Sequence, residues 1–176
     1  RMLVCAEDLG MVPTCVPWVM NDLRILTLEI QSMSKNPDYE FGHLEENPYR
    51  SVATISTHDM ATLRGWWDED AERTQRFYNY MLQKDGDAPH PMPGWLCEEV
   101  VARHLFCPSM LCLLSLQDWL SMDEQLRYPD ADFERINVPA NPRHYWRYRM
   151  HLTIEQLMEQ PALNEKILNL IKRSGR

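Results

Sequence analysis

The sequence predicts an α/β fold built on parallel strands, and three observations point to it. Four short apolar runs lack polar–apolar alternation, which is typical of strands buried on both faces. Helical patterns or long loops separate these runs, never two-residue turns, so neighbouring strands should run parallel. A carboxylate follows three of the four runs. The carboxyl ends of strands are where parallel α/β barrels carry their functional groups.

The first half of the chain predicts three of these strands. Residues 2–6 form an apolar run that ends where the chain turns at Glu7-Asp8-Leu9-Gly10. Pro13 suits the start of a helix. Residues 25–30 are rich in side chains that favour sheet, and residues 51–56 form a third run ended by Thr57-His58-Asp59. The segment between these last two runs is loop-like.

The second half predicts helices around a fourth strand. Residues 68–83 have a helical pattern with Phe77, Tyr80 and Met81 as the apolar stripe. Residues 95–107 predict a second helix, with Phe106 among its inward side chains. Residues 109–116 are the fourth strand candidate, followed by Gln117-Asp118. After a short helix and an irregular aromatic stretch, a terminal helix is expected near residues 161–172.

Composition excludes several classes of protein. The net charge of −8 argues against a general nucleic-acid binder, whose affinity comes from clustered Lys and Arg. The longest apolar stretch, around residues 110–114, is far short of the ~20 residues that span a membrane. No pair of the five cysteines has C-x-x-C spacing, so we expect buried free thiols in a reducing compartment. A cytoplasmic protein with neither nucleic-acid nor membrane partners is expected.

The carboxylates are the main candidates for chemistry. Glu7 and Asp59 follow strands two βα units apart, so a barrel would aim both into one cleft. There, one carboxyl can serve as a general acid while another stays ionised and stabilises positive charge. Glycosidic bond chemistry needs that division, because its transition state resembles an oxocarbenium ion. His58 could donate a hydrogen bond to a sugar hydroxyl.

Structural interpretations compete with these roles. Asp8 taken alone favours a helix cap, since acidic residues after a strand often cap the next helix. Trp66, Trp67 and Tyr145 could stack on sugar rings, although the Trp66-Trp67 pair is more typical of a core. The histidines show no H-x-H or H-E-x-x-H spacing, so no metal site is expected.

Four motifs in order resemble the 4-α-glucanotransferases, also called amylomaltases or disproportionating enzymes. Ala6-Glu7-Asp8-Leu9-Gly10 resembles the acid/base segment of that family, and Ser56-Thr57-His58-Asp59 with Thr62-Leu63-Arg64-Gly65-Trp66-Trp67 resembles its second catalytic segment. The family's C-terminal segments are similar to two further stretches: Leu116-Gln117-Asp118, and Arg135-Ile136-Asn137-Val138-Pro139 with Tyr145-Trp146-Arg147-Tyr148-Arg149. The likeness covers residues 2–158. Met60, where many bacterial members carry Asn, resembles the plant cytosolic subgroup, whose larger members carry starch-binding modules.

The resemblance implies a (β/α)₈ barrel and a retaining, double-displacement mechanism without a cofactor. Glu7 would be the general acid/base, and Asp59 would stabilise the transition state by holding hydroxyls of the reacting sugar. His58 would bind the same sugar, and Asn137 would contact the substrate. Asp8 and Asp118 are candidates for substrate binding at the barrel rim.

One departure from the family shapes the expectation. The family's nucleophile is an Asp in an Arg-x-Asp strand segment upstream of the acid/base, and this sequence has none. The four strands would correspond to strands five to eight of the barrel. We therefore expect residues 1–176 to be the C-terminal portion of the catalytic barrel, inactive alone. It should pair with the missing N-terminal half or with itself.

Two alternatives to a 4-α-glucanotransferase remain open. A retaining glycoside hydrolase of the α-amylase type shares the same carboxylate logic. A non-catalytic carbohydrate-binding piece would keep the aromatic and polar groups without the chemistry.

Overall fold

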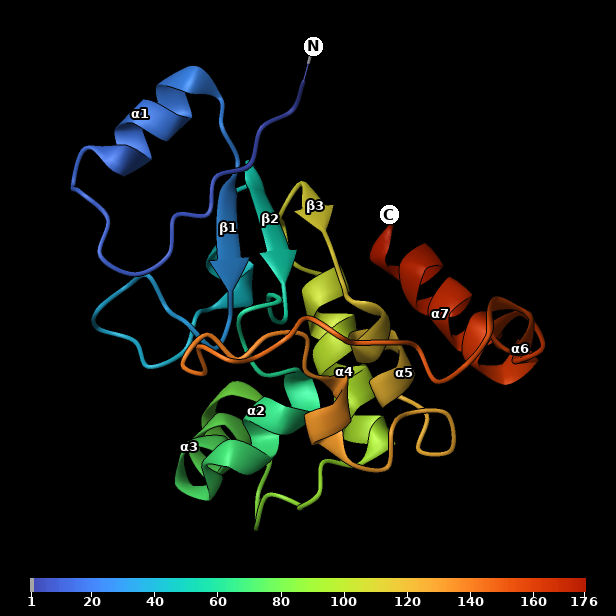
Figure 1. Cartoon of the computed structure of the whole chain (residues 1–176). Coiled ribbons are helices and arrows are strands. Elements are labelled where there is room, and N and C mark those ends of the chain that lie inside the picture. Colours follow the sequence, from blue (N-terminus) through green and yellow to red (C-terminus); the bar gives the residue numbers. More distant parts are fainter. Residues whose placement is uncertain (1) are drawn as a thin grey trace.

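The sheet is parallel, as the sequence predicts. The computed structural model describes residues 2–176, with strands β1 (Thr27–Ile30), β2 (Ser51–Thr54) and β3 (Leu111–Cys112) in the order β1-β2-β3 (Figure 1). Thr27 pairs with Ser51 and Val52 with Leu111, so all three strands run in the same direction. Every residue of β2 is buried, including the polar Ser51 and Thr54, as expected of a strand covered on both faces.

The first expected strand is reduced to one parallel bridge between Cys5 and Leu26. The Ala6 amide donates to the Leu26 carbonyl at 2.9 Å, and the Leu26 amide donates to the Val4 carbonyl at 2.8 Å. The expectation of a strand over residues 2–6 is therefore wrong in extent. Within the described chain no strand pairs with the other side of this segment, and Met2 and Leu3 are exposed to 91% and 59%. The order in space still follows the order in sequence.

Helix α1 (Val16–Leu23) connects this segment to β1 and begins three residues after the expected start at Pro13. Pro17 lies in its first turn, where a missing amide hydrogen costs nothing. Met20 is its buried residue, and Trp18 is 61% exposed. Figure 1 shows α1 standing apart from the helices that cover the sheet. A short 3₁₀ turn, η1 (Leu44–Glu46), precedes β2.

Three helical pieces replace the single helix expected over residues 68–83. They are α2 (Leu63–Glu69), α3 (Ala71–Arg76) and a π-helical turn, η2 (Phe77–Met81). The break falls at Asp70, whose side chain accepts the Arg73 amide and caps α3. The wider π turn changes which side chains face inward. Phe77 and Tyr78 are buried, whereas Tyr80, expected in the apolar stripe, is 75% exposed.

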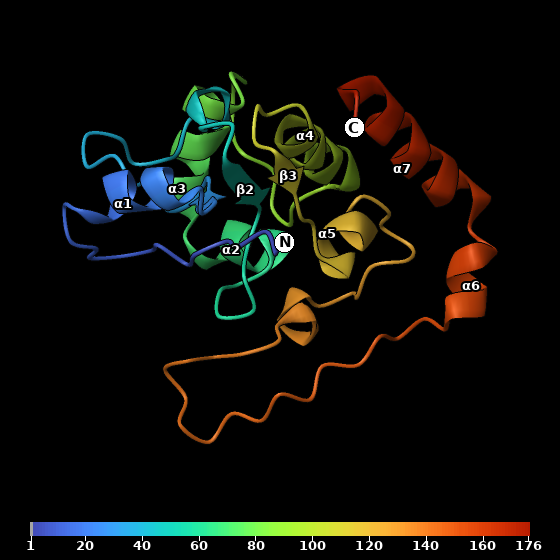
Figure 2. The same cartoon turned by 90° about the horizontal axis from the view of Figure 1, so that it is seen from above.

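Helix α4 (Gly94–Leu105) agrees with the prediction except at Phe106, which lies after the helix and is 52% exposed. The expected strand over residues 109–116 is only the two-residue β3 (Leu111–Cys112), and its last two positions belong to the start of helix α5 (Leu116–Ser121), which Ser115 caps. A 3₁₀ turn, η3 (Ala131–Glu134), opens a long irregular segment that leads to α6 (Ile154–Met158). Figure 2 shows this segment running along one side of the molecule. The expected terminal helix is α7 (Pro161–Ser174), which packs on α4.

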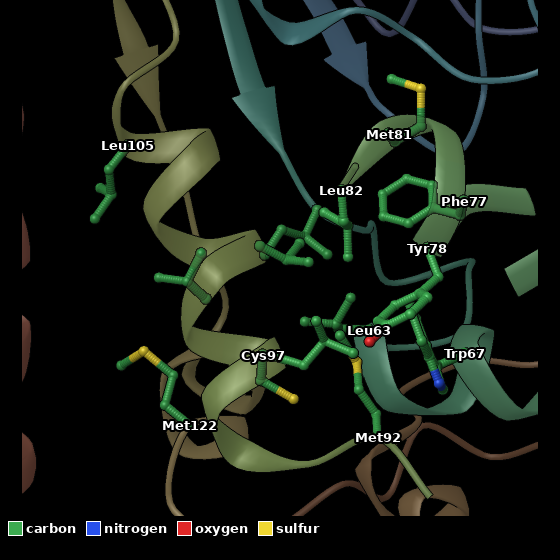
Figure 3. Packing of buried hydrophobic residues seen from close by; sticks show 14 of the residues in the cluster. Leu63, Trp67, Phe77, Tyr78, Met81, Leu82, Met92, Cys97, Leu105 and Met122 are labelled. Carbon is green, nitrogen blue, oxygen red and sulfur yellow. The ribbon is translucent and has the colours of Figure 1, made fainter. Parts of the chain in front are cut away.

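The main core lies between α4 and the α2–η2 region, as Figure 3 shows. Trp67 and Leu96 are fully buried there. Cys97 and Cys107 are buried as expected, but Cys5 and Cys15 are exposed, and all five cysteines are free thiols. No helix among residues 2–176 is long and apolar enough to cross a membrane.

Candidate active site

Three predicted site residues meet beyond the carboxyl end of β2. The Asn137 side-chain amide donates to Asp59 Oδ1 at 2.6 Å, and the Asn137 backbone amide donates to the His58 carbonyl at 3.1 Å. His58 Nε2 lies 3.5 Å from Asp59 Oδ2. Both carboxylate oxygens of Asp59 therefore face a nitrogen, while about 44% of its side chain remains exposed. The cluster can hold sugar hydroxyls, since it combines an exposed carboxylate with an amide and an imidazole.

An aromatic side chain that the sequence placed in a motif, without giving it a role, completes this cluster. Trp146 is 58% exposed, and its ring centroid lies 5.0 Å from that of His58 at an interplanar angle of 43°. Tyr145, the expected sugar platform, is 67% exposed and carries the Arg147 guanidinium 4.6 Å over its ring. Trp67 is core instead, and Trp66 packs against the core. The neighbouring Tyr-Trp pair was the available signal for Trp146.

Glu7 follows the Cys5–Leu26 bridge and has an exposed side chain. Because the carboxyl ends of parallel strands share one edge, Glu7 lies on the same edge of the sheet as the loop that carries Asp59. No hydrogen bond or ion pair occupies the Glu7 carboxylate within the described residues.

Asp8 is hydrogen-bonded to the backbone of β1 and caps no helix. Its Oδ1 accepts the Leu28 amide at 2.9 Å, and its Oδ2 pairs with Lys35 Nζ at 2.8 Å. Lys35 also pairs with Glu29 at 2.9 Å, so one cation serves two carboxylates. The helix-cap interpretation is wrong because residue 15, next to α1, is the N-cap position. Sequence reasoning missed Lys35 and Glu29, which have no motif around them.

Asp118 lies inside the first turn of α5 rather than at the end of a strand. It forms a capping box with Ser115, in which Asp118 Oδ2 accepts the Ser115 amide at 2.8 Å. The side chain is fully buried and its Oδ1 has no hydrogen-bond partner. Burial raises the pKa of Asp118 to about 6, against the lowering effect of the Ser115 bonds. The structure thus gives Asp118 a structural contact and no exposed carboxylate.

A buried ion pair joins Arg64 in α2 to Glu134 at the end of η3. Their side chains are only 4% and 3% exposed. Burial raises the pKa of Glu134, while the Arg64 guanidinium and the Thr62 hydroxyl act in the opposite direction. Sequence patterns did not indicate this pair. Among residues 2–176 no cluster of three or more His, Cys, Asp or Glu side chains could hold a metal ion.

A family model described as 4-alpha-glucanotransferase matches residues 1–154. The chain belongs to the 4-alpha-glucanotransferase family. The match includes Glu7, the Asp59 cluster and Trp146, and it leaves α7 outside.

Individual relatives agree with this assignment. The chain is 39% identical to 4-alpha-glucanotransferase DPE2 of Oryza sativa subsp. japonica over 99% of its own length and 18% of that protein. It is 28% identical to the 4-alpha-glucanotransferase of Chlamydia caviae over 98% of its length and 33% of the relative. The amylomaltase from Streptococcus agalactiae, solved in complex with acarbose, superposes with a TM-score of 0.72 at 15% identity, covering 98% of this chain and 32% of the amylomaltase. The chain therefore spans about a fifth to a third of these proteins.

Proposed function

We propose that this chain is the part of a retaining 4-α-glucanotransferase that carries the acid/base and the transition-state stabiliser. The reaction would move a segment of an α-1,4-glucan onto an acceptor sugar, in starch, glycogen or maltodextrin metabolism. The observation that carries the proposal is the contact of Asn137 and His58 with the exposed Asp59 carboxylate, on the same sheet edge as Glu7. Family membership supports the same reaction class.

The proposed roles follow from the chemistry of each group. Glu7 protonates the leaving oxygen, while an Asp upstream of this chain attacks the anomeric carbon and forms a covalent glycosyl-enzyme. Glu7 then removes the proton from the acceptor hydroxyl, whose oxygen attacks the anomeric carbon and releases the Asp carboxylate. The reaction is a transfer because the attacking hydroxyl belongs to a sugar and not to water. The negative Asp59 carboxylate stabilises the positive charge that develops on the sugar ring, and Asn137 holds that carboxylate in place. No step requires a cofactor.

The proposal includes a (β/α)₈ barrel in which these strands are the fifth to the eighth. Residues 1–176 are then its C-terminal portion, and the partner is the N-terminal half with the nucleophile. The exposed apolar side chains before β1 support such a partner: Met2 is 91%, Met11 104% and Trp18 61% exposed. The chain alone would lack transferase activity and would self-associate. Light scattering that finds a monodisperse monomer would count against the self-association.

The glucan substrates and the cytoplasmic location are also parts of the proposal. An exposed carboxylate, an imidazole and an exposed indole in one cluster suit a sugar ring, which offers hydroxyls at its edge and C–H groups on its face. The location rests on the cysteine pattern, which favours a reducing compartment.

The test is product analysis on the complete enzyme, in which this chain is joined to its N-terminal half. Maltotriose is supplied with and without free glucose. The proposal expects chains longer than maltotriose, and glucose should serve as an acceptor. Only shorter products would indicate the α-amylase-type hydrolase. Binding of maltotriose without any product would indicate a carbohydrate-binding protein.

A further inference from the structure

The buried pair of Arg64 and Glu134 lies between the two segments that form the Asp59 cluster. We propose that this pair is a positioning device that holds Asn137 against Asp59. The inference rests on the proposed function for its catalytic meaning, because the pair touches no substrate itself. Its structural part, which is the placement of Asn137, can be tested without activity.

Each oxygen of the Glu134 carboxylate has a hydrogen-bond partner. Arg64 Nη1 contacts Glu134 Oε1, and the Thr62 hydroxyl donates to Glu134 Oε2 at 3.0 Å. Both oxygens of Glu134 are thus bonded to the start of α2. A buried carboxylate needs such partners, since an unpaired charge in the interior is costly.

The arginine also binds the backbone that leads into η3. Arg64 Nη1 donates to the Tyr128 carbonyl at 2.6 Å, and Arg64 Nη2 donates to the Pro129 carbonyl at 3.2 Å. On the other side, Gln117 in α5 donates to the Glu134 carbonyl at 3.1 Å. The backbone from residue 128 to residue 134 is therefore tied to both α2 and α5. These ties end three positions before Asn137.

One member of the pair, Arg64, is close to Asp59 in the sequence. Arg64 follows Asp59 by five residues, so the pair joins the segment after β2 to the segment that carries Asn137. A buried ion pair is a poor source of net stability, because an apolar pair of similar volume often does as well or better. The ionic pair instead fixes geometry. A planar guanidinium that bonds one carboxylate and two backbone carbonyls restricts the relative positions of the segments that carry them.

The experiment compares Glu134→Gln with a matched control. Glu40→Gln is the control, because Glu40 accepts two hydrogen bonds from Arg76 in a pair whose side chains are 46% and 44% exposed. In the complete enzyme, Glu134→Gln should lower kcat/KM for maltotriose by about 10-fold or more, and Glu40→Gln by less than about twofold. In an Asn137→Ala background, Glu134→Gln should add less than about threefold, because the two changes remove one arrangement. Effects that multiply in full would overturn the proposal.

Hydrogen exchange on the complete enzyme gives a second readout that does not depend on activity. The Asn137 amide donates to the His58 carbonyl, and its exchange should speed up by about 10-fold or more in Glu134→Gln but not in Glu40→Gln. Should Glu134→Gln fail to fold, Thr62→Val removes only one bond to the carboxylate and should still speed this exchange. Unchanged exchange in a folded variant contradicts the positioning role. If exchange is fast in Glu134→Gln but the wild-type enzyme transfers no glucan, the proposed function is overturned and the positioning role of the pair stands.

Discussion

The side-chain amide of Asn137 donates a 2.6 Å hydrogen bond to the carboxylate of Asp59, across 78 positions of sequence. The Asn137 backbone bonds to His58 as well, so the irregular segment after η3 is part of the cluster and not a peripheral loop. A neutral amide leaves the negative charge of Asp59 in place while it fixes the direction of one oxygen. That is what a stabiliser of developing positive charge requires.

Loss of this amide should weaken catalysis more than binding. Asn137→Ala in the complete enzyme is expected to lower kcat/KM about 10- to 100-fold, because a hydrogen bond to a charged group contributes roughly 1.5–3 kcal/mol. The fall should lie mainly in kcat if Asp59 acts in the transition state. Steady-state kinetics with maltotriose measures it. Asn169→Ala on the exposed face of α7 is the control, and equal effects of both variants would refute the role.

Trp146 should contribute to binding of the sugar chain. Trp146→Ala is expected to raise KM for maltooligosaccharides about 2- to 10-fold, since an aromatic contact contributes roughly 0.5–1.5 kcal/mol. Trp146→Phe should recover most of this loss. Trp95, which is 52% exposed and far from His58 in sequence, offers a matched control as Trp95→Ala. A KM for Trp146→Ala within the error of the control would exclude a sugar contact.

The parallel strands were predictable because short runs rich in apolar and β-branched residues mark them, and β2 is buried throughout, including its polar Ser51 and Thr54. The cap of α5 was also readable, since Ser115 and Asp118 have capping-box spacing, but the apolar run before them favoured a longer strand. The π turn had no signal, because Tyr78 and Tyr80 are equally suited to either face by residue type.

The site around Asp59 also has some residues that the sequence indicates and some contacts that it does not. His58 and Asp59 follow a predicted strand, and this position alone makes them candidate site residues, before their contacts are known. Two further contacts join distant segments: the pairing of Arg64 with Glu134 and the tilted contact between the Trp146 and His58 rings. One sequence gives no direct sign of such contacts, so only the folded chain identifies them.

Lys35 should stabilise the fold because its positive charge offsets the repulsion between two neighbouring carboxylates. Lys35→Met leaves Asp8 and Glu29 without their shared cation, and their side chains are only 10% and 17% exposed. The free energy of unfolding is expected to fall by about 1–2 kcal/mol. Lys166→Met removes the more exposed pair with Glu98 and should cost less than about 1 kcal/mol. Urea denaturation compares the two, and an equal loss in both would contradict the account.

Two buried groups should oppose each other in the pH dependence of stability. Burial lowers the pKa of His104 to about 4, so the unfolded chain, with a pKa near 6.5, takes up a proton that the folded chain refuses. This contribution to stability is complete above pH 6.5 and is lost as pH falls towards 4. Asp118, with its pKa raised to about 6 from 3.8, acts with the opposite sign: its contribution is lost as pH rises from 3.8 to 6.

The variant Asp118→Asn should therefore expose the effect of His104. Its free energy of unfolding, relative to wild type, is expected to increase between pH 4 and pH 6 by about 2 kcal/mol. Urea denaturation at several pH values measures the difference. A difference between variant and wild type that does not change with pH would show that Asp118 keeps an ordinary pKa in the folded chain.

The most direct measurement of the central claim is the rate of maltotriose disproportionation by the complete enzyme carrying Glu7→Gln. Glutamine keeps the shape of the side chain but can neither give nor take the proton. Glu159→Gln, at an exposed position after α6, is the control and should leave the rate unchanged. The account predicts a loss of about 10²- to 10⁴-fold for Glu7→Gln. A rate within a few-fold of wild type would contradict the assignment of Glu7 as the acid/base.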